Sequence, residues 1–193
     1  MRKLIKPLVF VLALVPFAIL LLRIFQNNLG PDPVQELSLE TGEWTLRFLI
    51  IALAMTPLRR ITAHVEFTRH RRMLGLFALF YATLHLAVWL VFMLEFRWFA
   101  MAKELFERPY ITVGFSAYLI LLALGLTSPR VMVRKLGKNW KRLHKLVYVA
   151  AVLGVVHLLW ILRLDIGPAV LYGALVSLLL VYRAWFSLKS RRV

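Results

Sequence analysis

The sequence contains no cysteine. Disulfides, cysteine-ligated zinc, iron–sulfur clusters and thiol nucleophiles are therefore excluded. Acidic residues are also scarce, with nine Asp and Glu against 25 Lys and Arg. Neither a Walker-type phosphate loop nor a GxGxxG pattern occurs. A cysteine-based enzyme or a nucleotide-binding fold is therefore not expected.

Apolar residues, by contrast, make up 61% of the 193-residue chain, and the mean hydropathy is +0.76. Soluble domains contain about 45–50% apolar residues, so the sequence predicts an integral membrane protein. The formal net charge of +16 is also typical of nucleic-acid-binding proteins. In a chain this apolar, we interpret the basic residues as flanks of membrane spans that meet lipid, with no nucleic acid as partner.

The apolar runs predict an all-α bundle of six transmembrane helices forming a single domain over residues 1–193. The first run follows basic residues as in a signal peptide, but no small-x-small cleavage site follows it, so we expect it to remain as a span. The second run is short and ends at Pro57. The expected spans are about 8–25, 44–58, 73–94, 110–128, 143–162 and 167–186.

Charge is distributed unevenly between the predicted connections. The N-terminus, loops 59–72 and 129–142, and the tail hold seventeen Lys and Arg with a single acid, Glu66. The other connections, which include an acidic loop over 26–43, hold four Lys and Arg and eight acids. The positive-inside rule therefore predicts that both termini are cytoplasmic.

Two histidines lie deep inside predicted spans. His85 is about 18 Å from the start of the third span and His157 about 21 Å from the start of the fifth, at 1.5 Å per residue. Both spans start at the cytoplasmic face, so we expect the imidazoles at one level in the outer half. A haem between two helices needs one axial ligand from each at matched depth. The alternative is that both rings bond to backbone carbonyls or line a polar cavity.

The remaining histidines are harder to assign. His144 precedes His157 by thirteen residues, about 220° around a straight helix, so the two would not share a face. His144 is either a further haem ligand or an interfacial residue at a helix start. Met73 lies near the level of His144, where packing is its more usual role. We expect His64 and His70, among loop arginines, to face solvent.

Over nearly its whole length the chain resembles the MsrQ family, within the ferric-reductase-like transmembrane group. Each carrier of the resemblance is weak alone, but together, in this order and spacing, they are specific. They include Gly30-Pro31-Asp32-Pro33-Val34, Thr56-Pro57-Leu58, Arg71-Arg72-Met73-Leu74-Gly75-Leu76, Ala82-Thr83-Leu84-His85-Leu86, Arg108-Pro109-Tyr110-Ile111-Thr112, Leu143-His144-Lys145-Leu146-Val147-Tyr148 and His157-Leu158-Leu159-Trp160.

The resemblance implies a b-type haem held by histidines matching His85, His144 and His157, and a bound FMN. It implies a bacterial inner-membrane subunit that draws electrons from the respiratory quinone pool. These electrons pass to a periplasmic molybdenum-containing reductase, which repairs oxidised methionines of envelope proteins. The catalytic site for methionine sulfoxide is then expected on that partner, and none is assigned to this chain.

Two other functions stay open at this stage. A stand-alone ferric-reductase or oxidase-type cytochrome b normally carries a fused flavin and nicotinamide module, and the chain ends seven residues after the last predicted span. A non-redox scaffold or transporter would bind no haem, so a visible spectrum of the purified protein separates it from both redox alternatives.

Overall fold

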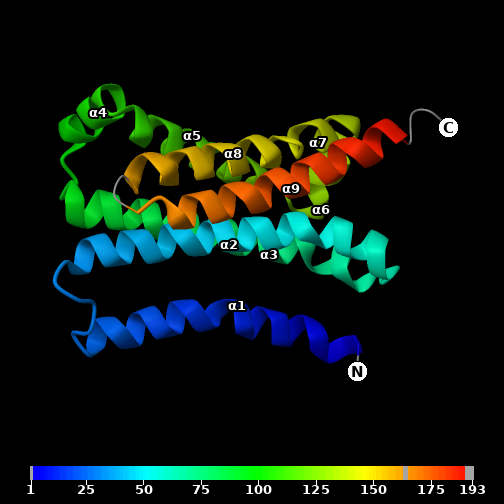
Figure 1. The fold of residues 1–193 in the computed structure, drawn as a ribbon, viewed down its shortest axis with the longest axis horizontal. Coiled ribbons are helices and arrows are strands. Elements are labelled where there is room, and N and C mark those ends of the chain that lie inside the picture. The colour runs from blue at the N-terminus through cyan, green and yellow to red at the C-terminus, as the bar shows by residue number, and fades with distance from the viewer. Residues whose placement is uncertain (1, 163–164, 190–193) are drawn as a thin grey trace.

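The computed structural model describes residues 2–162 and 165–189, and this part of the chain is helical throughout, without strands (Figure 1). The all-α prediction is therefore confirmed. The elements are α1 (Arg2–Phe25), α2 (Pro33–Thr62), α3 (Glu66–Val88), the π-helical turn η1 (Trp89–Met93), α4 (Trp98–Glu107), α5 (Pro109–Leu126), α6 (Arg130–Leu136), α7 (Lys138–Leu143), α8 (Leu146–Ile161) and α9 (Gly167–Lys189).

Five helical stretches of the described chain are long and apolar enough to cross a membrane: Ile5–Phe25, Glu66–Met93, Pro109–Leu126, Lys138–Ile161 and Gly167–Lys189. The chain is thus a multi-pass membrane protein. Helix α2 has 30 residues and is long enough to span, but its charged residues keep it outside this group. The predicted number of six spans therefore stays a prediction.

The two ends of the bundle differ in charge. Helix α1 begins and α9 ends at the same end, where α6 and α7 also lie, and we call this the basic end (Figure 1). The α1–α2 connection and α4 lie at the other end, which we call the acidic end (Figure 1). An even number of passes brings the two ends of a chain to one side, so this arrangement suits six spans.

The stretch 26–43, predicted as a loop, is helical from Pro33 onward. Asp32 caps α2, because its carboxylate accepts a hydrogen bond from the Gln35 N–H at 3.0 Å, and Pro33 occupies the first turn, where it costs no hydrogen bond. Arg23 of α1 forms ion pairs with Glu36 (2.8 Å) and Glu40 (2.5 Å). The acidic residues of this segment, which we had predicted to be a loop, therefore lie mostly on a helix, and Arg23 pairs with two of them.

Helix α2 also continues five residues beyond Pro57, where we had expected the second span to end. Proline has no N–H, so the carbonyl of Leu53, four residues earlier, loses its usual helical donor. Arg183 of α9 replaces that donor, with its Nη2 2.6 Å from the Leu53 oxygen. A side chain 130 residues away in sequence thus supplies the hydrogen bond that the carbonyl of Leu53 would otherwise lack.

The other predicted loops are likewise partly helical. The stretch 59–72 contains the end of α2 and the start of α3, the connection 95–109 contains α4, and 129–142 contains α6 and α7. The fifth span, predicted over 143–162, is interrupted at His144 and Lys145, which separate α7 from α8. The 220° separation of His144 and His157 was derived for a straight helix, so it does not apply to this interrupted stretch.

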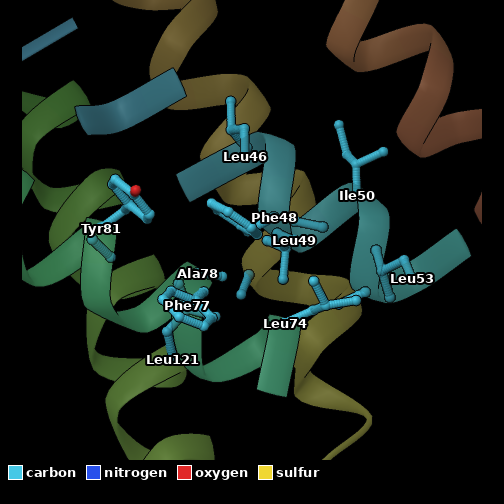
Figure 2. Close-up of a cluster of buried hydrophobic side chains, with 14 of the residues drawn as sticks. Leu46, Phe48, Leu49, Ile50, Leu53, Leu74, Phe77, Ala78, Tyr81 and Leu121 are labelled. Atoms are coloured by element: carbon cyan, nitrogen blue, oxygen red, sulfur yellow. The ribbon is translucent and has the colours of Figure 1, made fainter. Parts of the chain in front are cut away.

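The core lies where α2 faces α3, and it combines aliphatic side chains with the rings of Phe48, Phe77 and Tyr81 (Figure 2). The Phe48 and Tyr81 rings stack with centroids 5.2 Å apart. The Tyr81 hydroxyl donates to the Ala13 carbonyl (2.9 Å) and accepts from the Phe17 N–H (3.0 Å), so it bridges a helical hydrogen bond of α1 beside Pro16. This contact attaches α1 to the bundle.

Candidate functional site: a cavity with two histidines

A cavity of about 830 Å³ lies between α2, α3, α5 and α8. Its walls are mostly apolar, as is usual for a cofactor site. Small residues on each of the four helices leave the space open: Gly42, Ala82, Gly114, Ala117, Ala150 and Gly154. The cavity has the size and lining of a site for a large, mostly apolar molecule.

His85 of α3 and His157 of α8 both line this cavity, and their ring centroids are 6.0 Å apart. The prediction that these two rings lie at one level is thus confirmed. Imidazole–metal bonds are about 2.0–2.1 Å long, so this separation is of the right order for one metal ion between two rings. Within the described residues, no group of three or more His, Asp or Glu is placed to hold a metal ion.

The hydrogen bonds of both rings determine which nitrogen is free. Nδ1 of His85 lies 2.8 Å from the Ser38 carbonyl oxygen, and Nδ1 of His157 lies 2.7 Å from that of Tyr110. A carbonyl oxygen only accepts, so each Nδ1 carries the hydrogen, and in the neutral ring Nε2 holds the lone pair. This is the tautomer of a metal-ligating histidine whose other nitrogen is held by an outer partner.

Each histidine also packs against a glycine four residues beyond its carbonyl acceptor, Gly42 after Ser38 and Gly114 after Tyr110. A Cβ at Gly42 would lie 3.2 Å from His85, and one at Gly114 would lie 2.6 Å from His157. The missing side chains thus let each imidazole reach a helix carbonyl that a larger residue would cover. Sequence reasoning missed these four residues, because Gly42 lies in the segment predicted as an acidic loop and Gly114 carries no polar group that would mark a site.

The chemistry of this donor set fits haem. Two imidazoles with free Nε2 lone pairs would be able to hold a haem iron, and the cavity beside them is mostly apolar. Arg108, at the start of α5, is the one base among the cavity-lining residues that the structure describes, alongside the acids Asp32 and Glu104. Its guanidinium is ion-paired with Glu104 (3.1 Å) and donates to the Tyr110 hydroxyl (3.0 Å), and its remaining N–H groups are suited to a carboxylate at the rim of the cavity.

His144 lies apart from this pair, at the junction of α7 and α8, and does not line the cavity. Its ring stacks on Trp140 with centroids 4.0 Å apart, and its Nε2 is 3.2 Å from the Thr127 hydroxyl. Trp140 in turn donates from Nε1 to the Thr127 carbonyl at 2.9 Å. The structure therefore brings together two of the three predicted site histidines.

The other candidates lie outside the cavity. His64 is exposed as expected, whereas His70 is half-buried with Nδ1 2.9 Å from the Glu66 carbonyl oxygen. Met73 packs against the core, as predicted for its more usual role.

Over most of its length the chain is similar to known proteins. A family model described as "Ferric reductase like transmembrane component" matches residues 41–155. A protein of Xanthomonas oryzae pv. oryzae (strain MAFF 311018), named "Protein-methionine-sulfoxide reductase heme-binding subunit MsrQ", is 45% identical over 193 residues, which cover 97% of this chain and 88% of the relative. A protein of Herminiimonas arsenicoxydans with the same name is 44% identical over 191 residues, with the same coverage.

Proposed function

Because this chain belongs to the MsrQ family of ferric-reductase-like transmembrane proteins, we propose that it is a haem-binding electron-transfer subunit of a methionine sulfoxide reductase system. Electrons come from the respiratory quinone pool and leave to a periplasmic molybdenum-containing reductase, which forms a heterodimer with this chain and repairs oxidised envelope proteins. The observation that carries the proposal is the His85–His157 pair, with both Nδ1 atoms on carbonyls, in an apolar cavity.

In this proposal His85 and His157 hold a b-type haem, which supplies one-electron chemistry when bound. The carbonyls of Ser38 and Tyr110 fix the orientation of the two rings and increase the basicity of each Nε2. The apolar walls keep water from the metal position. Arg108 pairs with a carboxylate of the cofactor at the rim.

The direction of transfer follows from where the pair lies along the helices. Tyr110 is the second residue of α5, which follows α4 at the acidic end, so His157 is held near that end. The charge distribution supports an orientation with the acidic end outside the bacterial inner membrane and both termini cytoplasmic. The haem site is then nearer the periplasm, and the outer acids steer a basic surface of the partner.

An FMN is part of the same proposal, at the basic end. The residues proposed for its phosphate are the bases of α6 and α7 together with Arg71 and Arg72, and the exposed side chains of Arg134, Lys135 and Lys138 are available for contact. Neutralising these three together should lower the FMN content of the purified protein. Unchanged FMN would leave lipid contact and topology as their role.

Reconstitution into lipid vesicles with a reduced quinol tests the whole function. Haem should become reduced, stay reduced without the partner, and be reoxidised when the partner and methionine sulfoxide are added. The final step should slow with salt if acidic residues steer docking. Reoxidation by methionine sulfoxide alone would place the substrate site on this chain, and a preparation without a Soret band would leave a non-redox scaffold.

A further inference from the structure

A second cavity, of about 430 Å³, lies at the basic end between the ends of α2 and α9 and the start of α8. Its polar groups are two guanidinium groups and four hydroxyls, from Arg60, Arg183, Thr56, Tyr148, Tyr182 and Ser187. Each of these can donate a hydrogen bond, and no carboxylate lines the cavity. The described lining is therefore suited to an anion.

The positive charge in this cavity has no described counter-charge. Within the part of the chain that the structure covers, neither Arg60 nor Arg183 forms an ion pair with Asp or Glu. The nearby charge of Arg71 adds further repulsion at Arg183. A partly buried guanidinium inside a membrane helix is costly unless an anion or polar partners compensate it.

Arg183 has a structural role that occupies only part of its donor capacity. Its Nη2 donates to the Leu53 carbonyl beside Pro57, and its Nη1 donates to the Tyr148 hydroxyl at 2.6 Å. Its Nε is buried without a hydrogen-bond partner among the described residues. The Tyr148 hydroxyl accepts from Arg183 and so keeps its own hydrogen available for an acceptor in the cavity.

Arg60 completes the arrangement from the opposite helix. Its side chain is exposed, and its guanidinium carbon lies 4.9 Å from the centroid of the Phe186 ring, which also lines the cavity. The ring holds the guanidinium over the cavity without using its N–H groups. Arg60 of α2 and Arg183 of α9 thus line the same cavity.

We propose that this cavity binds a phosphate group, with Arg60 and Arg183 as its charged partners and the surrounding hydroxyls as further donors. Guanidinium forks match phosphate oxygens better than any other side chain does. The site is lined by α2, α8 and α9 and by no residue of α6 or α7, so its lining differs from the FMN surface proposed above, although Arg71 of that surface lies near Arg183. The phosphate comes either from an acidic phospholipid headgroup or from a soluble phosphate ester.

The test uses the full-length purified protein in a neutral detergent, with two probes. Native mass spectrometry with equal amounts of phosphatidylglycerol and phosphatidylcholine measures selective retention of the acidic lipid. Isothermal titration calorimetry with glycerol 3-phosphate, with glycerol as reference, measures binding of a soluble phosphate ester that carries no flavin. The probe that shows selective binding identifies the source of the phosphate.

Three variants separate this site from general charge effects. Arg60→Gln removes one charged partner, and Ser187→Asp places a carboxylate in the cavity. Arg59→Gln is the matched control, because Arg59 is an exposed neighbour that does not line the cavity. Losing one charge-assisted hydrogen bond should weaken selective binding by about tenfold or more, so we expect this loss in both cavity variants and not in Arg59→Gln.

Arg183 itself is left unchanged in this test, since its loss would also free the Leu53 carbonyl and disturb α2. Equal binding by Arg60→Gln and Arg59→Gln in both assays would overturn the proposal. Because neither assay involves haem or electron transfer, that outcome would leave the proposed redox function standing.

Discussion

His85 and His157 are held by the same kind of contact on two separate helix pairs, α2–α3 and α5–α8. In each pair, the imidazole Nδ1 donates to a carbonyl of the neighbouring helix, and a glycine four residues later leaves room for the ring. Both neighbouring helices also begin with proline in their first turn, after Asp32 in α2 and after Arg108 in α5. Their construction is alike although no internal repeat is visible in the sequence.

The two halves differ in how closely the ring approaches and in charge. A Cβ at Gly114 would overlap His157, whereas a Cβ at Gly42 would only crowd His85. The capping residue that lines the cavity is an acid in the α2 half and a base in the α5 half. We infer that the α5–α8 half is less tolerant of change.

Removing either imidazole should lower the haem content more than any other change does. The loss should be similar for the α2–α3 half and the α5–α8 half. His85→Ala or His157→Ala removes one of the two proposed haem ligands from a mostly apolar cavity, so each variant should lose most of its haem. The haem-to-protein ratio of the purified protein measures this, and His64→Ala, at an exposed position, is the control. Near-normal haem content in both variants would refute the pairing.

Replacing each glycine by alanine should lower the haem content to different extents in the two halves. Gly114→Ala forces the His157 ring away from its carbonyl, because the new atom would lie 2.6 Å from Nδ1 and Cε1. Overpacking of this kind costs about 1–3 kcal/mol, so haem content should fall clearly. Gly42→Ala requires a shift of only a few tenths of an ångström at His85 and should cost less.

Gly75→Ala is the matched control for both glycine variants. A Cβ at Gly75 meets no atom within 4 Å, and alanine favours α3 by about 1 kcal/mol. Haem content and thermal stability should therefore be unchanged or slightly improved in this variant. Equal haem loss in the alanine variants at positions 42 and 114 would show that the halves do not differ in tolerance.

Removing the positive charge of Arg108 at the rim of the cavity should have a smaller effect on haem binding. Arg108→Gln removes the one base among the described cavity-lining residues, which weakens a carboxylate contact at an exposed position by up to about 1 kcal/mol. We expect a few-fold faster loss of haem to a haem acceptor such as apomyoglobin. Arg97→Gln, exposed and outside the cavity, is the control, and equal rates in the two variants would exclude Arg108 as the rim contact.

The sequence was sufficient to predict an all-helical membrane protein and the meeting of His85 with His157, because both follow from apolar run length and helical rise. It also offered two readings of the histidines, metal ligation or bonding to backbone carbonyls. The structure shows that the second does not exclude the first, because each ring has two nitrogens. Only Nδ1 is used by the carbonyl.

What could not be predicted depends on contacts between distant segments. The continuation of α2 past Pro57 depends on Arg183, and the acidic start of α2 depends on Arg23. Local patterns of charge and proline favoured loops at both places, and tertiary partners reversed that preference. The access of each histidine to a carbonyl likewise depends on a glycine of another helix.

The smallest effect on the pair is expected from His144. Its Nε2 faces the Thr127 hydroxyl and its ring stacks on Trp140. His144 does not line the cavity that contains His85 and His157. His144→Ala should therefore leave the haem of His85 and His157 in place, and if a second haem is bound at the basic end only that one should be lost.

A redox titration followed by visible absorbance separates these outcomes by the number of haem components that it resolves. Thr127→Val is the matched control, because it removes the hydroxyl partner of His144 at a cost of about 1 kcal/mol. A His144→Ala protein as depleted of haem as His85→Ala would show instead that His144 belongs to the same site, so that the separation between the basic-end histidine and the pair would no longer hold.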